Sequence, residues 1–317
     1  MNMNRVVHAL LLAALPVFSL LPLVVPSTAA ASSLDEFRDV MARGSHTLVA
    51  NIENDSMLLK RDDGLFTSGM NFRSAWTLME GPQARTWDWH IGQDLYTASD
   101  INLRPSQIAR NDHPYAGWLY AGVTRQVNRS DGGFHRVGLD VGCLGPCAGG
   151  ERTQKTLHNL INQALPQAWS TQLRNEAGIV LHGAWAPLRW TPARWFDLTP
   201  SLHGRFGNIF TDAGAEVMVR AGRLNLFPQQ PALFGFLRGD VRAVGYNATL
   251  QGGYFSSSDA RTVAPRRTVG ELEAGVAWQG ERFGLIASVV RRGNEMAGWP
   301  GSRGSQNFAR VQLEFRP

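Results

Sequence analysis

The chain has 317 residues, of which 44% are hydrophobic and 18% charged, and its formal net charge at pH 7 is +5. The basic residues are almost all arginine and form no basic run or basic helix, which argues against a nucleic-acid partner. After the N-terminus no segment has the ~18 consecutive apolar residues of a transmembrane helix, so only a β-barrel could place this chain in a membrane.

The N-terminus has the order of a secretory signal peptide. Arg5 and His8 precede an apolar run over 9–25, and small residues follow over 27–31. We therefore predict a signal peptide over 1–31 and export of a single domain over 32–317. A membrane anchor is the alternative, but the run is short for a span and prolines interrupt it.

The exported part alternates apolar residues with charged or small ones at a period of two, as strands with two different faces do. Residues 136–143 and 271–278 show this alternation clearly. No internal repeat or linker divides the chain, so the pattern predicts one domain of about twelve strands. The predicted strands cover 47–59, 67–80, 85–97, 115–128, 134–144, 175–187, 195–207, 214–224, 235–248, 267–279, 281–293 and 305–315.

The alternation fits two all-β folds, a soluble sandwich with charges outside and a membrane barrel with charges in its lumen. Long strands of about 10–14 residues, an even strand count and the aromatic Phe315 near the end of the last strand favour the barrel. Aromatic clusters near predicted strand ends also favour it; they are Trp185, Trp190, Trp195 and Phe196, and Phe227, Phe234 and Phe236. We therefore predict an all-β fold, an antiparallel transmembrane β-barrel of about twelve strands in the outer membrane.

A loop broken by glycine and proline over 142–150 leads into a short helical pattern over 151–165. Gln154 and His158 are four residues apart and therefore share one face of that helix. A histidine that a β scaffold presents in this way is suited to act as a catalytic base. If the chain enters the barrel from the periplasm, the connections after the first, third and fifth predicted strands are extracellular, and the helix is with them.

The first two predicted strands carry further polar candidates. Asn54-Asp55-Ser56 interrupts the alternation of the first strand, and its carboxylate and amide oxygens are hard ligands that suit Ca²⁺. Thr67 opens the second strand and offers a hydroxyl group. Each motif also has a simpler interpretation, a polar pair that faces the lumen or an ordinary strand start.

Cys143 and Cys147 are the only cysteines of the chain. An oxidising compartment permits a disulfide between them, although the intervening loop is tight. Two thiols alone do not make a four-ligand zinc site, so we expect a structural or incidental role for the pair.

Five motifs in consistent order, from about Asn51 to Gly222, resemble the LpxR family of outer-membrane lipid A 3'-O-deacylases. They are Asn54-Asp55, Phe66 to Gly69, Pro114-Tyr115-Ala116-Gly117, the Gly-Pro-x-Ala segment that continues through Gln154 and His158, and Gly207-Asn208 to Gly222. One of these motifs alone is a weak signal, whereas five in order on a barrel pattern are a strong one.

The resemblance implies a twelve-stranded barrel that removes the 3'-linked acyloxyacyl group of lipid A. It implies that His158 is the general base that activates water and that Gln154 orients His158 or the substrate. Thr67 would lie beside the site. A Thr67 nucleophile with His158 as its base stays open as a second mechanism.

The resemblance also implies a dependence on calcium, with Asn54 and Asp55 as the residues that hold Ca²⁺. Arg104, in the loop after the third predicted strand, is the nearest candidate for a basic residue that binds the substrate. The partners would be lipid A and the outer membrane, with the active site on the extracellular side.

Two other functions remain open. A calcium-dependent outer-membrane phospholipase would use a serine nucleophile with a histidine on the barrel wall, but no such pair on one strand stands out. We expect His182 and His203 to be solvated or to face the lumen. A non-catalytic barrel, either a channel or a structural protein, would have no need of the polar motifs described above.

Overall fold

The computed structural model describes residues 27–58, 64–256, 259, 261–299 and 304–317. The chain divides between Asp39 and Val40 into two compact units, and α2 (Ser27–Arg43) runs across the division. Among the described helices, none has the length and apolarity needed to cross a membrane. Residues 1–26 lie outside the described part, so the signal peptide over 1–31 and the domain limits 32–317 stay predictions.

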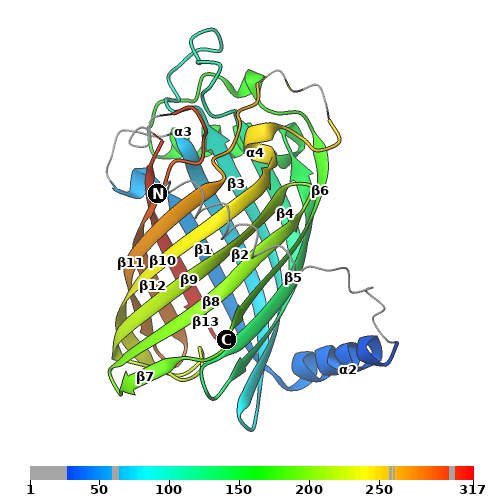
Figure 1. The fold of residues 1–317 in the computed structure, drawn as a ribbon, viewed down its shortest axis with the longest axis vertical. Helices are drawn as coiled ribbons and strands as arrows, with labels where there is room; N and C mark the ends of the chain where they lie inside the picture. The colour runs from blue at the N-terminus through cyan, green and yellow to red at the C-terminus, as the bar shows by residue number, and fades with distance from the viewer. Residues whose placement is uncertain (1–26, 59–63, 257–258, 260, 300–303) are drawn as a thin grey trace, which may run out of the picture. The chain divides into compact units, whose positions relative to one another are not determined.

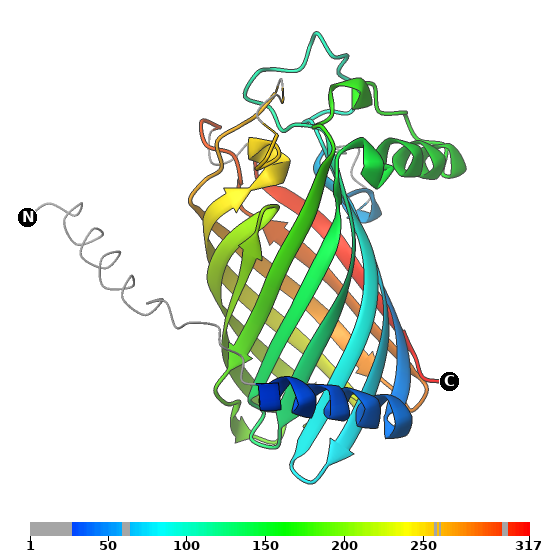
Figure 2. The same cartoon turned by 90° about the vertical axis from the view of Figure 1, so that its right-hand side faces the viewer.

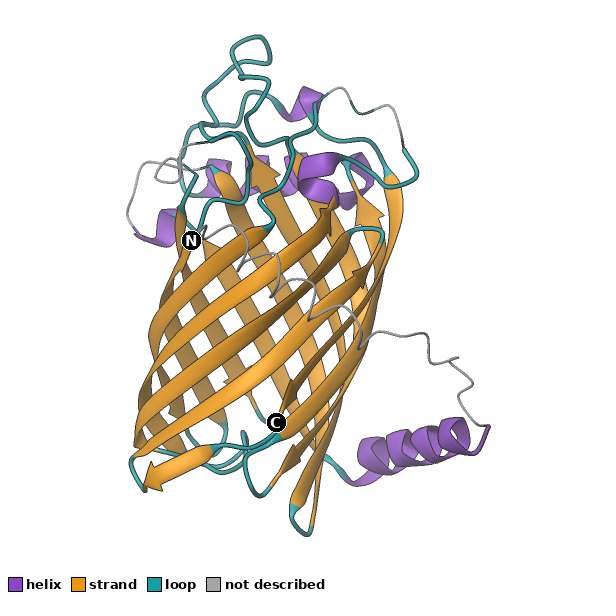
Figure 3. Cartoon of the chain, viewed as in Figure 1, coloured by secondary structure: helices purple, strands orange, loops and turns teal. Residues whose placement is uncertain are grey.

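The second unit, Val40–Pro317, holds a 13-stranded antiparallel sheet in which all strands except the short β7 close into a barrel (Figures 1 and 3). β1 pairs with both β2 and β13, and β6 pairs with β8, which completes the ring. The strands are β1 (Ser45–Asn54), β2 (Leu65–Glu80), β3 (Gln83–Thr97), β4 (Ala116–Arg129), β5 (Phe134–Leu144), β6 (Glu176–Ala186), β7 (Trp190–Ala193), β8 (Phe196–Gly207), β9 (Phe210–Arg223), β10 (Ala232–Asn247), β11 (Thr268–Gln279), β12 (Phe283–Arg292) and β13 (Gln306–Phe315).

Every predicted strand is confirmed, β5 with the predicted ends and the others with shifted ends, and β7 is an addition that the sequence did not predict. β1 ends at Asn54 because the side chain of Asn54 accepts the N–H of Ser56 at 2.8 Å and turns the chain into η1 (Ser56–Leu58). α3 (Gly150–Leu160) ends earlier than predicted, because Asn162 adopts a left-handed φ of 56°.

The outer face of the barrel is apolar and its lumen is charged, which is the reverse of a soluble sandwich. On β11, Leu272 and Val276 are 57% and 58% exposed, whereas Glu271 and Glu273 are 6% and 4% exposed. The buried glutamates face arginines inside the barrel; Arg238 contacts both of them, at 2.6 and 2.7 Å. An apolar face turned outwards excludes the sandwich and requires an apolar surrounding.

The predicted aromatic clusters are confirmed in part. Trp185, Trp190 and Trp195 are 48%, 57% and 63% exposed near one end of the barrel, as interfacial aromatic residues are. The second cluster is different, because Phe227 is buried and the ring of Phe234 lies under the Arg220 guanidinium at 4.7 Å. Phe234 therefore belongs to the lumen side of β10.

The two ends of the barrel differ. One end, here called the turn rim, has tight connections such as 80–83 and 279–283 and holds the C-terminal end of β13. The other end, here called the loop rim, has the long connections and most short helices (Figure 2): η1, η2 (Pro146–Ala148), α3, η3 (Trp169–Thr171) and α4 (Ala248–Gln251). The connections after β1, β3 and β5 all lie at the loop rim, as strand parity predicted.

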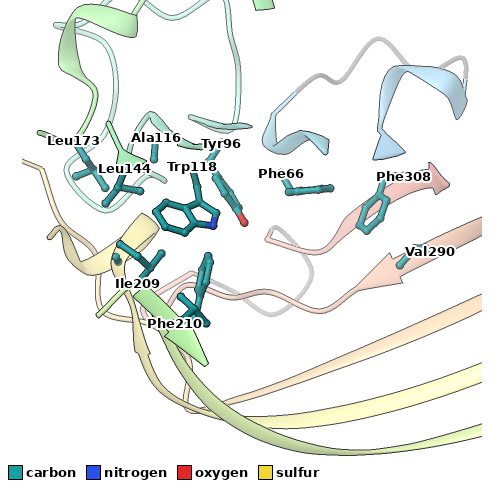
Figure 4. Close-up of a cluster of buried hydrophobic side chains, with 12 residues drawn as sticks. Phe66, Tyr96, Ala116, Trp118, Leu144, Leu173, Ile209, Phe210, Val290 and Phe308 are labelled. Carbon is teal, nitrogen blue, oxygen red and sulfur yellow. The ribbon is translucent and has the colours of Figure 1, made fainter. Parts of the chain in front are cut away.

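An apolar cluster spans the lumen just below the loop rim. It joins side chains from strands all around the barrel, including Phe66, Tyr96, Trp118, Phe210 and Phe308 (Figure 4). Trp118 at its centre is 2% exposed. Below this cluster a cavity of about 530 Å³ lies in the charged lumen. The cavity and the cluster are neighbours in the lumen, because Tyr120 lines the cavity and packs against the cluster.

Candidate functional site

Polar side chains interrupt the apolar outer face of β1, β2 and β3 where these strands reach the loop rim. On β1, the exposed Ile52 places Asn54 on the outer face by alternation, and on β3 the exposed Ile91 places Leu95 and Thr97 there. Asn54 pairs with Ser68 of β2, whose side chain lies on the same face. The candidate groups of these three strands therefore face away from the lumen.

Thr67 is the extra residue of a β-bulge in β2. Phe66 pairs with Tyr96 and Ser68 pairs with Leu95, so Thr67 has no residue opposite to it. The hydroxyl of Thr67 lies 2.8 Å from the hydroxyl of Thr97 and is almost fully buried. The bulge allows Phe66 to enter the lumen cluster while Thr67 stays on the outer side.

Asn54 and Asp55 are held at the junction of β1 and β2. The amide nitrogen of Asn54 donates to the carbonyl of Thr67 at 3.1 Å. Asp55 is 6% exposed, and its Oδ2 accepts the N–H of Gly64 at 3.1 Å. The structure therefore brings the two predicted calcium ligands and Thr67 together.

α3 lies outside the barrel wall at the loop rim, where it is the longest of the green helices in Figure 2. The segment that leads into it packs on the outer face of β3, because the side chain of Gln93 donates to the carbonyl of Ala148 at 2.6 Å. Gly150, the first residue of α3, lies against the side chains of Leu95 and Trp169. These contacts fix the first turn of the helix on the wall.

A disulfide strengthens this attachment. Cys143, near the end of β5, is bonded to Cys147 in η2, with the two Cα atoms 6.0 Å apart. The backbone N–H of Cys147 also donates to the side chain of Asn175 at 2.8 Å. The pair is structural, one of the two roles that the sequence left open.

Gln154 and His158 lie on the buried face of α3 together with Gly150, which confirms the predicted shared face. Gln154 Oε1 accepts the indole N–H of Trp169 at 2.8 Å. Trp169 in turn belongs to an apolar cluster with Leu95 of β3. Gln154 is therefore positioned from the barrel wall through one tryptophan.

His158 is 5% exposed, and its Nδ1 lies 2.5 Å from the carbonyl oxygen of Ala164. A carbonyl only accepts, so Nδ1 carries the proton of the neutral ring and donates it to this bond. In that tautomer Nε2 is the basic nitrogen. The chain reversal after α3 thus orients the imidazole for proton transfer at Nε2.

Arg104 lies in the connection after β3, at the same rim but exposed to solvent. Its described hydrogen bonds are local, with its N–H donating to the side chain of Gln107 at 2.9 Å and its carbonyl accepting the N–H of Gln107. The structure therefore places Arg104 at the loop rim without fixing its guanidinium beside Asn54 or His158.

Two buried titratable groups at the loop rim have shifted pKa values. Burial lowers the pKa of His113, although the hydrogen bond from its Nδ1 to the carbonyl of Pro114 acts in the opposite direction. Burial would raise the pKa of Glu295, but the nearby Arg292 and Arg242 hold it below its ordinary value. The rim therefore favours a neutral His113 and an ionised Glu295.

A family model described as "Outer membrane protein LpxR" matches residues 11–316. The chain belongs to the LpxR family. Family membership and the barrel together place this LpxR-family protein in the outer membrane. A comparison with curated proteins gives no match.

Among solved structures, the chain is similar to LpxR from Salmonella typhimurium, with a TM-score of 0.72 and 21% identity over 86% of this chain and 100% of that chain. This similarity shows a shared fold. The β-domain of the Bordetella autotransporter BrkA has a TM-score of 0.47 and 10% identity over 86% of this chain and 98% of that chain. The translocator domain of NalP from Neisseria meningitidis has a TM-score of 0.40 and 11% identity over 92% of this chain and 97% of that chain.

Sequence reasoning missed the residues that position the candidate groups of this LpxR-family site. Trp169 holds Gln154 and Thr97 holds Thr67. Trp169 stands in a connection with no periodic pattern, so no sequence signal identified it. Thr97 could have been found, because the hairpin of β2 and β3 brings its position opposite the start of β2.

The donor set of the junction between β1 and β2 fits a calcium ion. Its side-chain donors are oxygens alone, the amide oxygen of Asn54, the carboxylate of Asp55 and the hydroxyls of Thr67 and Ser68, and hard oxygen ligands are those that Ca²⁺ prefers. Ca²⁺ takes about six to eight oxygen ligands, so backbone carbonyls, water or substrate oxygens would complete the set.

Proposed function

We propose that this LpxR-family barrel is an ester hydrolase that removes the 3'-linked acyloxyacyl group of lipid A. The observation that carries the proposal is the position of the candidate groups, which lie on the outer face of the wall at the loop rim. A lipid beside the barrel reaches that face without entering the lumen. Barrels of this class have short periplasmic turns and long extracellular loops, so the loop rim corresponds to the leaflet that contains lipid A.

In the proposed reaction, His158 Nε2 removes a proton from a water molecule as the water oxygen attacks the ester carbonyl. The tetrahedral intermediate collapses with cleavage of the bond between the acyl carbon and the 3' oxygen. His158 returns its proton to that oxygen, so the products are the free hydroxyl and the released fatty acid. Ala164 supports both steps, because its carbonyl holds Nδ1 and keeps Nε2 as the reacting nitrogen.

Asn54 and Asp55 would hold the calcium ion of this site. When bound, the ion would supply electrostatic stabilisation for the negative charge that develops on the ester oxygen and for the phosphates of lipid A. Gln154, positioned by Trp169, would orient the imidazole or the substrate.

One observation favours this function over a channel, and another favours water over Thr67 as the nucleophile. The apolar side chains packed in the lumen below the loop rim support an enzyme over a channel, because a channel needs a continuous polar path. The hydroxyl of Thr67 contacts the hydroxyl of Thr97, which is no base, and this supports water over Thr67 as the nucleophile. A phospholipase would use the same outer face, so the substrate test must include phospholipids.

Mass spectrometry of lipid A from cells with and without the protein tests the proposal. We expect the active barrel to produce lipid A that lacks the 3' acyloxyacyl group, and His158→Ala to leave lipid A intact. His135→Ala, which changes an exposed histidine at the opposite end of the barrel, should behave as the wild type. An unchanged lipid A profile from folded wild-type protein would refute the proposed function.

A further inference from the structure

A second group of chemically active side chains lies inside the lumen, away from the outer-face site. His90 of β3, Asp140 of β5 and His182 of β6 bring two imidazole nitrogens and a carboxylate oxygen within 4.8 Å of one another. All three residues line the lumen cavity, as expected for His182. The proposed deacylation uses none of them.

The barrel register and two glycines make room for this group. His90, Gly122 and Asp140 lie opposite one another on β3, β4 and β5, so two side chains meet across a residue that has none. A Cβ atom at Gly122 would lie 2.5 Å from His90 Nε2 and would collide with the Asp140 carboxylate. Gly138 has the same relation to the ring of His182, where a Cβ would lie 2.5 Å from Nε2.

The two distances from Asp140 to the imidazoles are close to those of a tetrahedral metal centre. Metal–ligand bonds of 2.0–2.2 Å place neighbouring ligand atoms about 3.3 Å apart. Asp140 Oδ1 lies 3.4 Å from His182 Nε2 and 2.7 Å from His90 Nε2. The first distance fits as it stands, and the second requires a side-chain movement of about half an ångström.

His90 also has the outer partner that a metal-binding histidine usually has. Its Nδ1 lies 3.1 Å from Asp88 Oδ1, and both side chains are less than a tenth exposed. A carboxylate that accepts the proton of one ring nitrogen leaves the other nitrogen as the ligand, and it increases the basicity of that ligand. Here the remaining nitrogen is Nε2, which lies 2.7 Å from Asp140 Oδ1, and the ring of His182 is 6.2 Å from that of His90 between centroids.

We propose that His90, Asp140 and His182 form a Zn²⁺ site in the barrel lumen, with the fourth position open to the lumen cavity. Two imidazoles and one carboxylate are a ligand set that Zn²⁺ accepts, whereas Ca²⁺ prefers oxygen alone. The ion would cross-link the inner faces of β3, β5 and β6. This site is independent of the proposed deacylase site, because the two lie on opposite faces of the wall.

Titration with Co²⁺, a spectroscopic substitute for Zn²⁺, tests the site in the full-length barrel after chelation of divalent ions in detergent. We expect the visible absorption of a tetrahedral centre in the wild type and its displacement by Zn²⁺. His182→Ala should abolish the signal, and His182→Asn is a second variant if the first does not fold. Asp88→Asn should weaken binding about 10- to 100-fold, as loss of an outer partner does.

Two controls separate this site from the other groups. His203→Ala removes a lumen histidine that pairs with Asp240 at 2.5 Å and that, among the described residues, belongs to no group of three ligands, so this variant should bind Co²⁺ as the wild type does. The pair Asn54→Ala and Asp55→Ala should also leave the signal unchanged. A folded wild type without a tetrahedral signal, or a signal that survives in His182→Ala and His182→Asn, would overturn the proposal.

Discussion

The indole N–H of Trp169 donates to Gln154 Oε1 at 2.8 Å, and this bond connects the helix that carries His158 to the wall of the barrel. Trp169 is 1% exposed and packs with Leu95 and Tyr115, so its ring is held by its neighbours. The orientation of the buried face of α3 therefore depends on a residue that contributes no reacting atom.

Trp169→Phe should lower activity at least about tenfold while the barrel stays folded. The substitution keeps most of the ring but leaves the buried Gln154 Oε1 without its donor, at a cost of about 1–3 kcal/mol to the local structure. The turnover rate measures the loss of activity, and heat-modifiable gel mobility checks that the barrel stays folded. Trp185→Phe, an exposed tryptophan near the turn rim, is the matched control and should change neither.

His158→Gln should reduce the rate of ester cleavage about 10²- to 10⁴-fold, the usual contribution of a general base. Glutamine retains a polar group that can donate to the carbonyl of Ala164, so the end of α3 should keep its form. Initial rates with purified lipid A measure the effect. A variant that keeps more than half of the wild-type rate would exclude His158 as the base.

Asp55→Asn should raise the Ca²⁺ concentration that gives half-maximal activity by about tenfold or more, because the charge of the ligands sets calcium affinity. The amide can still accept the N–H of Gly64, so the turn should remain. Chelation should abolish wild-type activity, and added Ca²⁺ should restore it. Asp131→Asn, an exposed carboxylate at the turn rim, should leave the calcium dependence unchanged.

Acid should destabilise the loop rim through His113 and Glu295. Burial lowers the pKa of His113 in the folded protein, so below its ordinary pKa of about 6.5 only the unfolded form gains the proton, and stability falls. The pKa of Glu295 is also lowered, so its contribution is present above the unfolded pKa and is lost as pH falls through the folded value. The thermal unfolding midpoint should therefore decrease from pH 7 to pH 5 and further towards pH 4.

His113→Asn separates the two groups. In this variant the unfolding midpoint should no longer decrease between pH 7 and pH 5. It should still decrease at lower pH, where Glu295 becomes protonated. An unfolding midpoint that rises on acidification in the wild type would have the wrong sign for a buried neutral histidine.

The strands were predictable because each has one apolar and one polar face, and a period of two marks that contrast without any tertiary information. Which face of each strand is turned outwards was not predictable, since a sandwich and a barrel share the same pattern and differ only in the face that is exposed. The exposed Leu272 and the buried Glu271 show that the apolar face is the outer one. The shared face of Gln154 and His158 was predictable from helix geometry alone.

Contacts of the site between residues far apart in the chain could not be predicted from the sequence. The bulge at Thr67 depends on the register between β2 and β3, and the partner of Gln154 comes from a loop 15 residues away. The lumen group at Asp140 was missed for the same reason, since His90 is 50 residues away and meets it only across Gly122. Strand pairing and loop packing, and not local pattern, create these contacts.

The most direct measurement presents purified barrel, with Ca²⁺, to lipid A and phosphatidylethanolamine in the same micelles and identifies the released acids by mass spectrometry. We predict release of the 3'-linked acyloxyacyl group from lipid A, intact phospholipid, and no release by His158→Ala. Hydrolysis of the phospholipid with lipid A intact, or no release of acid from either lipid by folded protein, would contradict the assignment of this barrel as a lipid A 3'-O-deacylase.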